Sequence, residues 1–130
     1  QRIRRCPTFI ALVALHDRFV EMVNQRNIGK FDGVVFPQAP ITGNEDIKQI
    51  MNYQELSLEG KKMHHCIASY VNRILNNEYF VFQVFEPERA TVGIHYQKGK
   101  LKVDQIKLAC NQMPSEETKE KVFYWFSNEN

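Results

Sequence analysis

The segment between residues 79 and 108 constrains the fold most, because its hydrophobic pattern has a period of two whereas the preceding residues have a helical period. Tyr79–Phe85 is almost wholly apolar, as expected of a strand covered on both faces. Arg89–Tyr96 alternates between apolar and polar residues, and Lys98-Gly99 suits a tight hairpin turn. A third strand, Lys100–Leu108, follows that turn. The pattern predicts a three-stranded antiparallel meander.

The alternation assigns side chains of the second strand to two faces. One face carries Ala90, Val92, Ile94 and Tyr96, and the other carries Arg89, Thr91, Gly93 and His95. In the third strand, Leu101 and Val103 share a face, but Ile106 and Leu108 fall on the opposite one. A β-bulge near Asp104-Gln105 would restore the phase, and bulges often re-aim side chains beside functional sites.

Segments with helical periodicity or helix-start residues flank the predicted sheet. They are Thr8–Arg26, a short helix that Asn44 caps and that runs to Met51, Gln54–Gly60, the residues from Cys66 to Leu75, and a last helix opened by Pro114-Ser115. Between the first two, Lys30–Gly43 contains glycines and prolines that break regular structure, and only Val34-Val35-Phe36 could be briefly extended. We therefore expect an α+β fold, with the three-stranded meander packed against helices on its N- and C-terminal sides.

Length and charge set limits on the domain and its partners. With 130 residues, 43% of them hydrophobic, residues 1–130 suit a single domain with a real core. The first residue is Gln1 rather than Met, so we expect the chain to be a piece of a longer one. The net charge of +2 forces no partner, since nucleic-acid binders usually show a stronger, clustered excess. The run Lys98, Lys100 and Lys102 is a local exception that we expect to be solvated surface.

Cysteine usage and hydropathy indicate the compartment. Cys6, Cys66 and Cys110 are an odd number at wide spacing, which is not typical of a disulfide framework. We expect reduced thiols in the cytoplasm. No apolar run approaches the roughly 20 residues of a spanning helix, so we expect no membrane partner. The sequence identifies no cofactor.

The densest group of reactive side chains is His64, His65 and Cys66, at the expected entry to a helix. The N–H groups of a helix start and an adjacent imidazolium would both lower the pKa of Cys66. The order of Cys66, His95 on one strand and Gln105 on the next is similar to that of papain-like thiol hydrolases.

Four blocks in sequence order carry a resemblance to a known family. They are Leu58-Glu59-Gly60, then Met63-His64-His65-Cys66-Ile67-Ala68-Ser69-Tyr70, then Glu88-Arg89-Ala90-Thr91, and finally Gln105 and Asn111 with Pro114. These blocks resemble the PcfJ-like domain, and the match spans nearly the whole chain. The resemblance implies a bacterial cytoplasmic protein associated with conjugative plasmids, integrated elements or phages, and implies no particular reaction. His95 is outside the family pattern, so His64 or His65 would be the base for a Cys66 nucleophile.

The resemblance also implies a set of candidate ligand-binding positions, namely Glu59, Ser69, Tyr70, Glu88, Arg89, Thr91, Gln105 and Asn111. Arg89 and Thr91 share a strand face, and a guanidinium is suited to bidentate capture of phosphate. We therefore expect an accessory or binding module whose partner is a nucleic acid or a phosphate-bearing small ligand.

Three alternatives stay open for the His-His-Cys block. The first is a hydrolase or transferase that depends on Cys66. The second is a metal-dependent enzyme to which Cys110 or His95 adds a ligand, although consecutive helical residues diverge by about 100° and cannot all face one ion. The third is a structural block in which Cys66 is simply a small buried side chain.

Overall fold

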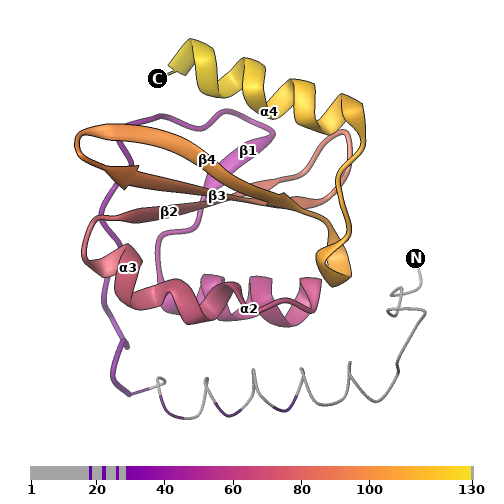
Figure 1. The fold of residues 1–130 in the computed structure, drawn as a ribbon. Coiled ribbons are helices and arrows are strands. Elements are labelled where there is room, and N and C mark those ends of the chain that lie inside the picture. Colours follow the sequence, from indigo (N-terminus) through magenta and orange to yellow (C-terminus); the bar gives the residue numbers. More distant parts are fainter. Residues whose placement is uncertain (1–17, 19–21, 23–25, 27–28, 130) are drawn as a thin grey trace.

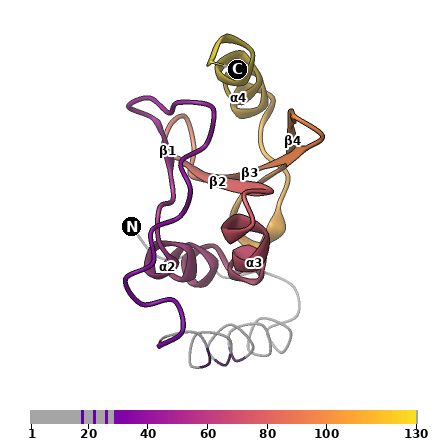
Figure 2. The ribbon, with the colours of Figure 1, turned by 90° about the vertical axis from the view of Figure 1, so that its left-hand side faces the viewer.

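An antiparallel sheet with the strand order β1-β2-β3-β4 separates two layers of helices in the computed structural model, which describes Arg18, Met22, Arg26 and residues 29–129 (Figure 1). The strands are β1 (Ile47–Gln49), β2 (Tyr79–Val84), β3 (Ala90–Gln97) and β4 (Lys100–Lys107). One face is covered by α2 (Tyr53–Met63), the short 3₁₀ helix η1 (Ile67–Tyr70) and α3 (Val71–Leu75), and the other by α4 (Glu116–Glu129) (Figures 1 and 2). The predicted α+β class is confirmed.

The sheet has four strands rather than the three predicted, because the segment expected to be a helix capped by Asn44 contains β1. The Asn44 side chain accepts hydrogen bonds from the backbone N–H groups of Asp46 (2.8 Å) and Ile47 (2.9 Å), as a helix cap would. The chain then leaves this turn as a strand, and Ile47, which is fully buried, pairs with Val84 of β2. A side chain that caps a helix can equally close a turn, and here burial of Ile47 against the sheet decides the outcome.

The remaining helical predictions differ in their outcomes. The predicted helix Gln54–Gly60 is present as α2, which begins after Asn52, whose side chain accepts from the N–H of Glu55 (2.9 Å). The predicted helix from Cys66 to Leu75 is divided into η1 and α3. Thr8–Arg26 lies outside the described residues except for three exposed helical positions, Arg18, Met22 and Arg26. Within the part of the chain that the structure describes, no helix has the length and apolar character needed to cross a membrane.

The predicted bulge in the third strand is confirmed and has a structural consequence. Gly93 pairs with Gln105, whereas its neighbour Ile94 pairs with Val103, so Asp104 is the extra residue. Directly opposed residues share a face of the sheet. Lys107, opposite Thr91, therefore lies on the same face as Gln105, toward α2 and α3.

A core lies on each face of the sheet. The apolar set of β3 packs toward α4, where Val122 and Trp125 are buried. Trp125 also donates a hydrogen bond from Nε1 to the carbonyl of Thr42 (2.8 Å). The second core, on the face toward α2 and α3, includes Leu56 and Tyr79. Two separate cores fix the sheet from both sides, so the polar face of β3 is held against α2.

Gly93 leaves room for the hydroxyl of Tyr79 above the sheet. A Cβ atom at residue 93 would lie 1.9 Å from that hydroxyl oxygen and 2.6 Å from Cζ of the same ring. Glycine is therefore required for the Tyr79 side chain to occupy its place on β2.

We expect Gly93→Ala to lower the free energy of unfolding by at least about 2 kcal/mol, because the buried Tyr79 ring must move. Urea denaturation measures the change. Gly29→Ala is the matched control, since a Cβ there meets nothing within 4 Å. Equal unfolding midpoints for the two variants would contradict this account of Gly93.

Candidate functional site

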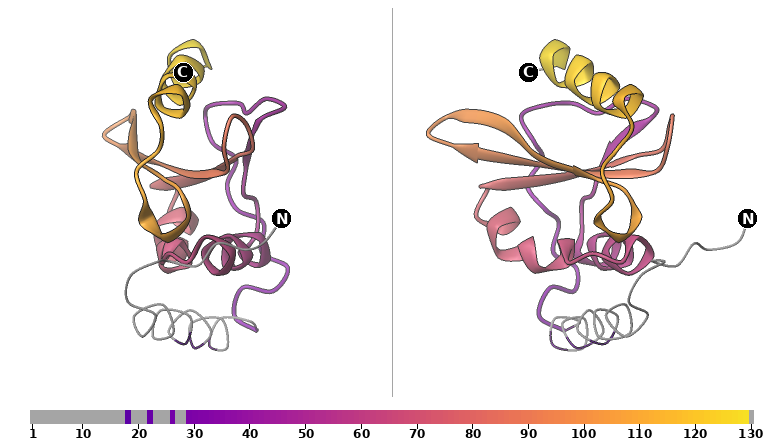
Figure 3. Two further views of the ribbon diagram at one scale, coloured as in Figure 1. Left: turned by 90° about the vertical axis from the view of Figure 1, so that its right-hand side faces the viewer. Right: turned by 45° about the vertical axis from the view of Figure 1, so that its right-hand side comes forward.

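A pocket of about 190 Å³ lies between the segment after α2 and the strands β3 and β4. Its lining residues come from the segment after α2, η1, β3, β4 and the segment after β4: His65, Cys66, Ile67, Tyr70, Thr91, Gln105, Lys107 and Asn111. In Figure 3 the segment that contains the 3₁₀ helix η2 (Ala109–Asn111) runs from the end of β4 toward α2 before the chain returns to α4. This detour brings Asn111 to the pocket.

Six of the eleven residues expected at a site line this pocket, and two further residues were missed. The six are His65, Cys66, Tyr70, Thr91, Gln105 and Asn111. Ile67 and Lys107 were not anticipated. The phase fault in the third strand was the signal for Lys107, because a bulge at Asp104 moves residues 105 and 107 to the face of the sheet that carries Thr91.

The carboxylate of Glu59 is the centre of the polar network behind the pocket. Glu59 lies in the penultimate turn of α2 and is 1% exposed. It accepts hydrogen bonds from the guanidinium of Arg89, the hydroxyl of Thr91 and the amide of Gln83 (3.0 Å). A buried carboxylate without such partners would cost several kcal/mol. The three donors, all on β2 and β3 or just before β3, therefore hold α2 against the sheet.

Arg89 is committed to the protein rather than to the pocket. Its guanidinium binds Glu59 and also donates to the carbonyls of Val84 (3.3 Å) and Ala90 (2.8 Å). It lies over the Phe85 ring, 4.9 Å from the centroid. Arg89 does not line the pocket. The guanidinium expected to capture phosphate is therefore directed to partners within the protein.

Thr91 connects Glu59 to His65. The Thr91 hydroxyl has one proton, which it donates to Glu59, so it accepts a hydrogen bond from Nε2 of His65 (3.1 Å). This network assigns a proton to Nε2 and fixes the orientation of the His65 ring. His65 is 4% exposed and lies at the pocket wall.

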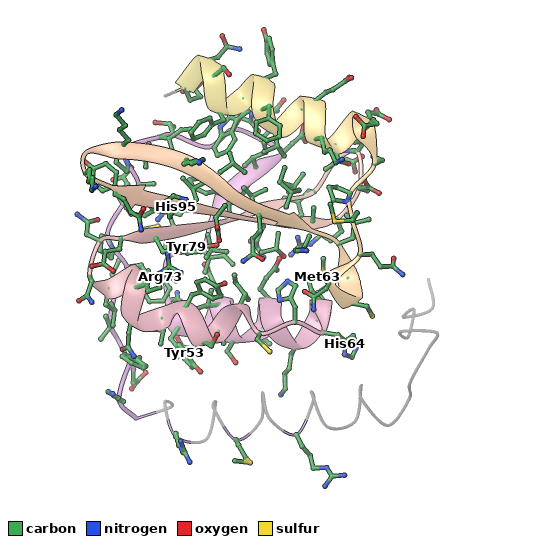
Figure 4. The ribbon with its side chains drawn as sticks, viewed as in Figure 1. Tyr53, Met63, His64, Arg73, Tyr79 and His95 are labelled. Carbon is green, nitrogen blue, oxygen red and sulfur yellow. The ribbon has the colours of Figure 1, made fainter. Side chains whose placement is uncertain are left out.

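The end of α2 separates the two histidines. His64 adopts a left-handed conformation (φ 53°), and the N–H of His65 bonds to the carbonyl of Gly60 (3.1 Å), as in a Schellman motif. A Cβ at Gly60 would lie 3.0 Å from the His65 carbonyl oxygen, so glycine allows the chain to fold back closely. Figure 4 shows His64 at the end of α2, and it does not line the pocket. His65 is thus the histidine that the fold directs toward Thr91.

Cys66 lies at the pocket rim as a free, exposed thiol. The expected helix start is the four-residue η1, which gives little dipole, and partial burial raises the pKa of the thiol. The direction of this shift is opposite to the one expected of a nucleophile. Ser69 donates from Oγ to the Cys66 carbonyl (2.7 Å) and so closes the local turn.

The other cysteine and histidine candidates lie elsewhere. Cys110 is disulfide-bonded, so the expectation that all the thiols are reduced is wrong for this residue. His95 is paired with Tyr79, four residues along β3 from Thr91, and does not line the pocket. The arrangement of Cys66, His95 and Gln105 expected for a thiol hydrolase is therefore not assembled. No three His, Cys, Asp or Glu side chains of the described residues are placed to hold a metal ion.

Glu88 accepts hydrogen bonds from the start of α4, the helix on the opposite face of the sheet. Its carboxylate accepts from the N–H (2.9 Å) and hydroxyl (2.7 Å) of Ser115 and from the hydroxyl of Thr118. These hydrogen bonds lower the pKa of Glu88. The adjacent residues Glu88 and Arg89 therefore fix the sheet to different layers, and Glu88 contributes nothing directly to the pocket.

Tyr79 positions the Gln105 side chain at the back of the pocket. The Tyr79 hydroxyl donates to Asp104 (2.8 Å) and accepts from Nε2 of Gln105 (3.1 Å). Burial, followed by the hydrogen bond to Asp104, raises the pKa of Tyr79, so the phenol stays protonated. The bulge residue and its neighbour are thus both tied to one buried hydroxyl.

Comparison with known proteins supports the assignment made from the motifs. A family model described as PcfJ-like protein matches residues 4–123. No curated protein and no solved structure matches the chain.

We expect Glu59→Gln to lower the free energy of unfolding by roughly 2–4 kcal/mol, because it removes the charge that pairs with Arg89 and places an amide donor against other donors. Urea denaturation would show the loss, and Glu120→Gln at an exposed position of α4 is the control. If both variants unfold at the wild-type midpoint, the network does not hold α2 to the sheet.

We expect the alkylation rate of Cys66 to follow an apparent pKa above that of a cysteine-containing reference peptide, because burial favours the neutral thiol. The neutral form dominates below the raised pKa, so alkylation accelerates only at higher pH than in the peptide. Mass spectrometry of the peptide containing Cys66, after iodoacetamide treatment over a pH series, gives the profile. A midpoint below that of the reference would support a thiol nucleophile instead.

Proposed function

The chain belongs to the PcfJ-like protein family, and we propose that it is a binding module whose pocket takes the phosphate-bearing part of a ligand. The module would act as an accessory in DNA transfer or in the maintenance of a bacterial mobile element. The groups proposed to contact the phosphate are Lys107, Gln105 and Asn111.

The observation that carries this proposal is the bulge at Asp104. In a regular strand, residues 105 and 107 would point to the α4 side, into the apolar core. The extra residue turns the Gln105 amide and the Lys107 ammonium toward the pocket instead. The same bulge returns Ile106 to the apolar core on the α4 side, so one extra residue both completes the core and gives the pocket its amide and ammonium groups.

The charge balance of the lining favours an anion. Lys107 brings a positive charge, and no Asp or Glu is among the residues that line the pocket. The nearest buried carboxylate, Glu59, is paired with Arg89, which neutralises it. Amide and ammonium donors converging on one hollow are suited to phosphate oxygens.

The size of the pocket limits the part of the ligand that enters. A volume of about 190 Å³ is below the range of roughly 300–1,000 Å³ for pockets that enclose a drug-sized molecule. The pocket would therefore accept a phosphate with an attached sugar or base, while the remainder of a longer ligand stays outside.

A hydrolase or transferase that depends on Cys66 is the alternative. The adjacent His65 lines the same pocket and could act as its base, whereas His64 lies outside it. The raised pKa of the thiol counts against this alternative. The alkylation profile described above distinguishes the two functions.

We expect Lys107→Met to weaken binding of thymidine 5′-monophosphate about tenfold or more, because a charge-assisted hydrogen bond contributes roughly 1.5–3 kcal/mol. Isothermal titration calorimetry measures the affinity, with thymidine as the ligand lacking phosphate. Lys48→Met, an exposed lysine on β1 at the other edge of the sheet, is the matched control and should bind like the wild type.

Two outcomes would contradict the proposal. One is that neither inorganic phosphate nor the monophosphate binds the wild-type protein at millimolar concentration. The other is that Lys107→Met and Lys48→Met bind the monophosphate equally well.

A further inference from the structure

We propose that the ligand of this pocket is a single-stranded nucleic acid that lies along β4, with one phosphate in the pocket and the following phosphates on the lysines of the hairpin. This inference rests on the proposed function and specifies its ligand class. It starts from the position of β4, which is an edge strand of the described sheet (Figure 2).

The bulge gives the lysines of β4 a common face. Lys100 pairs with Gln97 and Lys102 with His95, and both partners are on the face of β3 that carries Thr91. Lys107, opposite Thr91, joins them only because of the extra residue Asp104. The run that looked like ordinary solvated surface in the sequence is therefore aligned with the pocket.

These cations are available to an external anion. Lys98, Lys100 and Lys102 are exposed, and neither they nor Lys107 form an ion pair with a described residue. The one acidic residue of β4, Asp104, has its carboxylate bound by the Tyr79 hydroxyl. The strand thus presents three lysines, and the turn a fourth, against one acidic residue, Asp104.

An aromatic and cationic stack lies between the pocket and the hairpin. The guanidinium of Arg73 is 5.2 Å from the ring centroid of Tyr70 and 4.6 Å from that of Tyr79, which is fully buried. Tyr70 lines the pocket, and Arg73 lines a second hollow together with Lys98 and one acidic residue, Glu78. The half-buried Tyr70 ring and the Arg73 guanidinium are groups on which a base of a single-stranded nucleic acid can stack.

The length and chemistry of the row of lysines on β4 and its turn favour a polynucleotide. Lys100 and Lys107 are separated by seven residues, or roughly 20 Å of strand, so a mononucleotide in the pocket could not reach Lys100. An anionic membrane is the other linear or planar polyanion to consider. Peripheral membrane segments insert apolar side chains, whereas the turn from Gln97 to Lys100 carries only polar residues and Gly99.

The experiment measures binding of a fluorescent, 5′-phosphorylated oligothymidylate by anisotropy over a range of salt concentrations. Each lysine that contacts a single strand contributes about 0.7 to the slope of log K against log salt. The double variant Lys100→Ala/Lys102→Ala should therefore bind more weakly, with a slope flatter by about 1.4. Lys48→Ala/Lys62→Ala, also two exposed lysines, should match the wild type.

The result for the monophosphate separates this inference from the proposed function. We expect the Lys100→Ala/Lys102→Ala variant to bind thymidine 5′-monophosphate as the wild type does, and circular dichroism should show an unchanged melting curve. Two results would contradict binding of a nucleic acid along β4 without contradicting phosphate binding in the pocket. One is that the oligonucleotide binds no tighter than the monophosphate, and the other is that both double variants have the same slope of log K against log salt. Vesicles containing phosphatidylserine that bind through Lys100 and Lys102, with no binding of the oligonucleotide, would overturn this inference in favour of a membrane surface.

Discussion

The buried carboxylate of Glu59 is the constraint on which the rest of the structure depends. It is the meeting point of α2, β2 and the start of β3, and it gives the helix a fixed height above the sheet through three donors. Because a buried charge is tolerated only with such partners, the positions of Arg89 and Thr91 follow from it. Thr91 in turn accepts a hydrogen bond from His65 and so fixes the orientation of the His65 ring at the pocket wall. The hydrogen bonds that pack α2 against the sheet therefore also position the pocket residues Thr91 and His65.

Much of the sheet could be predicted from the sequence because a period of two is a direct consequence of strand geometry. The bulge was predictable for the same reason. The apolar residues of β4 change phase between Val103 and Ile106, and both must face the core beside α4. The first strand was not, because the Asn44 side chain makes the same hydrogen bonds in a turn as at a helix start. Pairing of Ile47 with Val84, nearly forty residues away, decided between the two.

Many residues of the candidate site could be predicted from the sequence, but the contacts that each of them makes could not. Strand alternation placed Arg89 and Thr91 together, but it says nothing of Glu59, which lies about thirty residues earlier on a helix and binds both. The His-His-Cys block was likewise visible as three reactive neighbours. The left-handed backbone of His64 at the end of α2 separates them, so that His65 contacts Thr91 and Cys66 remains at the rim.

The pairing of Glu59 with Arg89 also determines the electrostatic character of the pocket. An unpaired carboxylate hydrogen-bonded to Thr91 behind the pocket wall would repel an anion, and the low dielectric of the interior would strengthen that repulsion. The guanidinium of Arg89 cancels the charge without entering the pocket. The carboxylate can then orient Thr91 and His65 as a hydrogen-bond acceptor while Lys107 sets the sign of the local potential. Because Glu59 and Arg89 pair behind the pocket wall, the lining has no uncompensated negative charge, which is the condition for an anion to bind there.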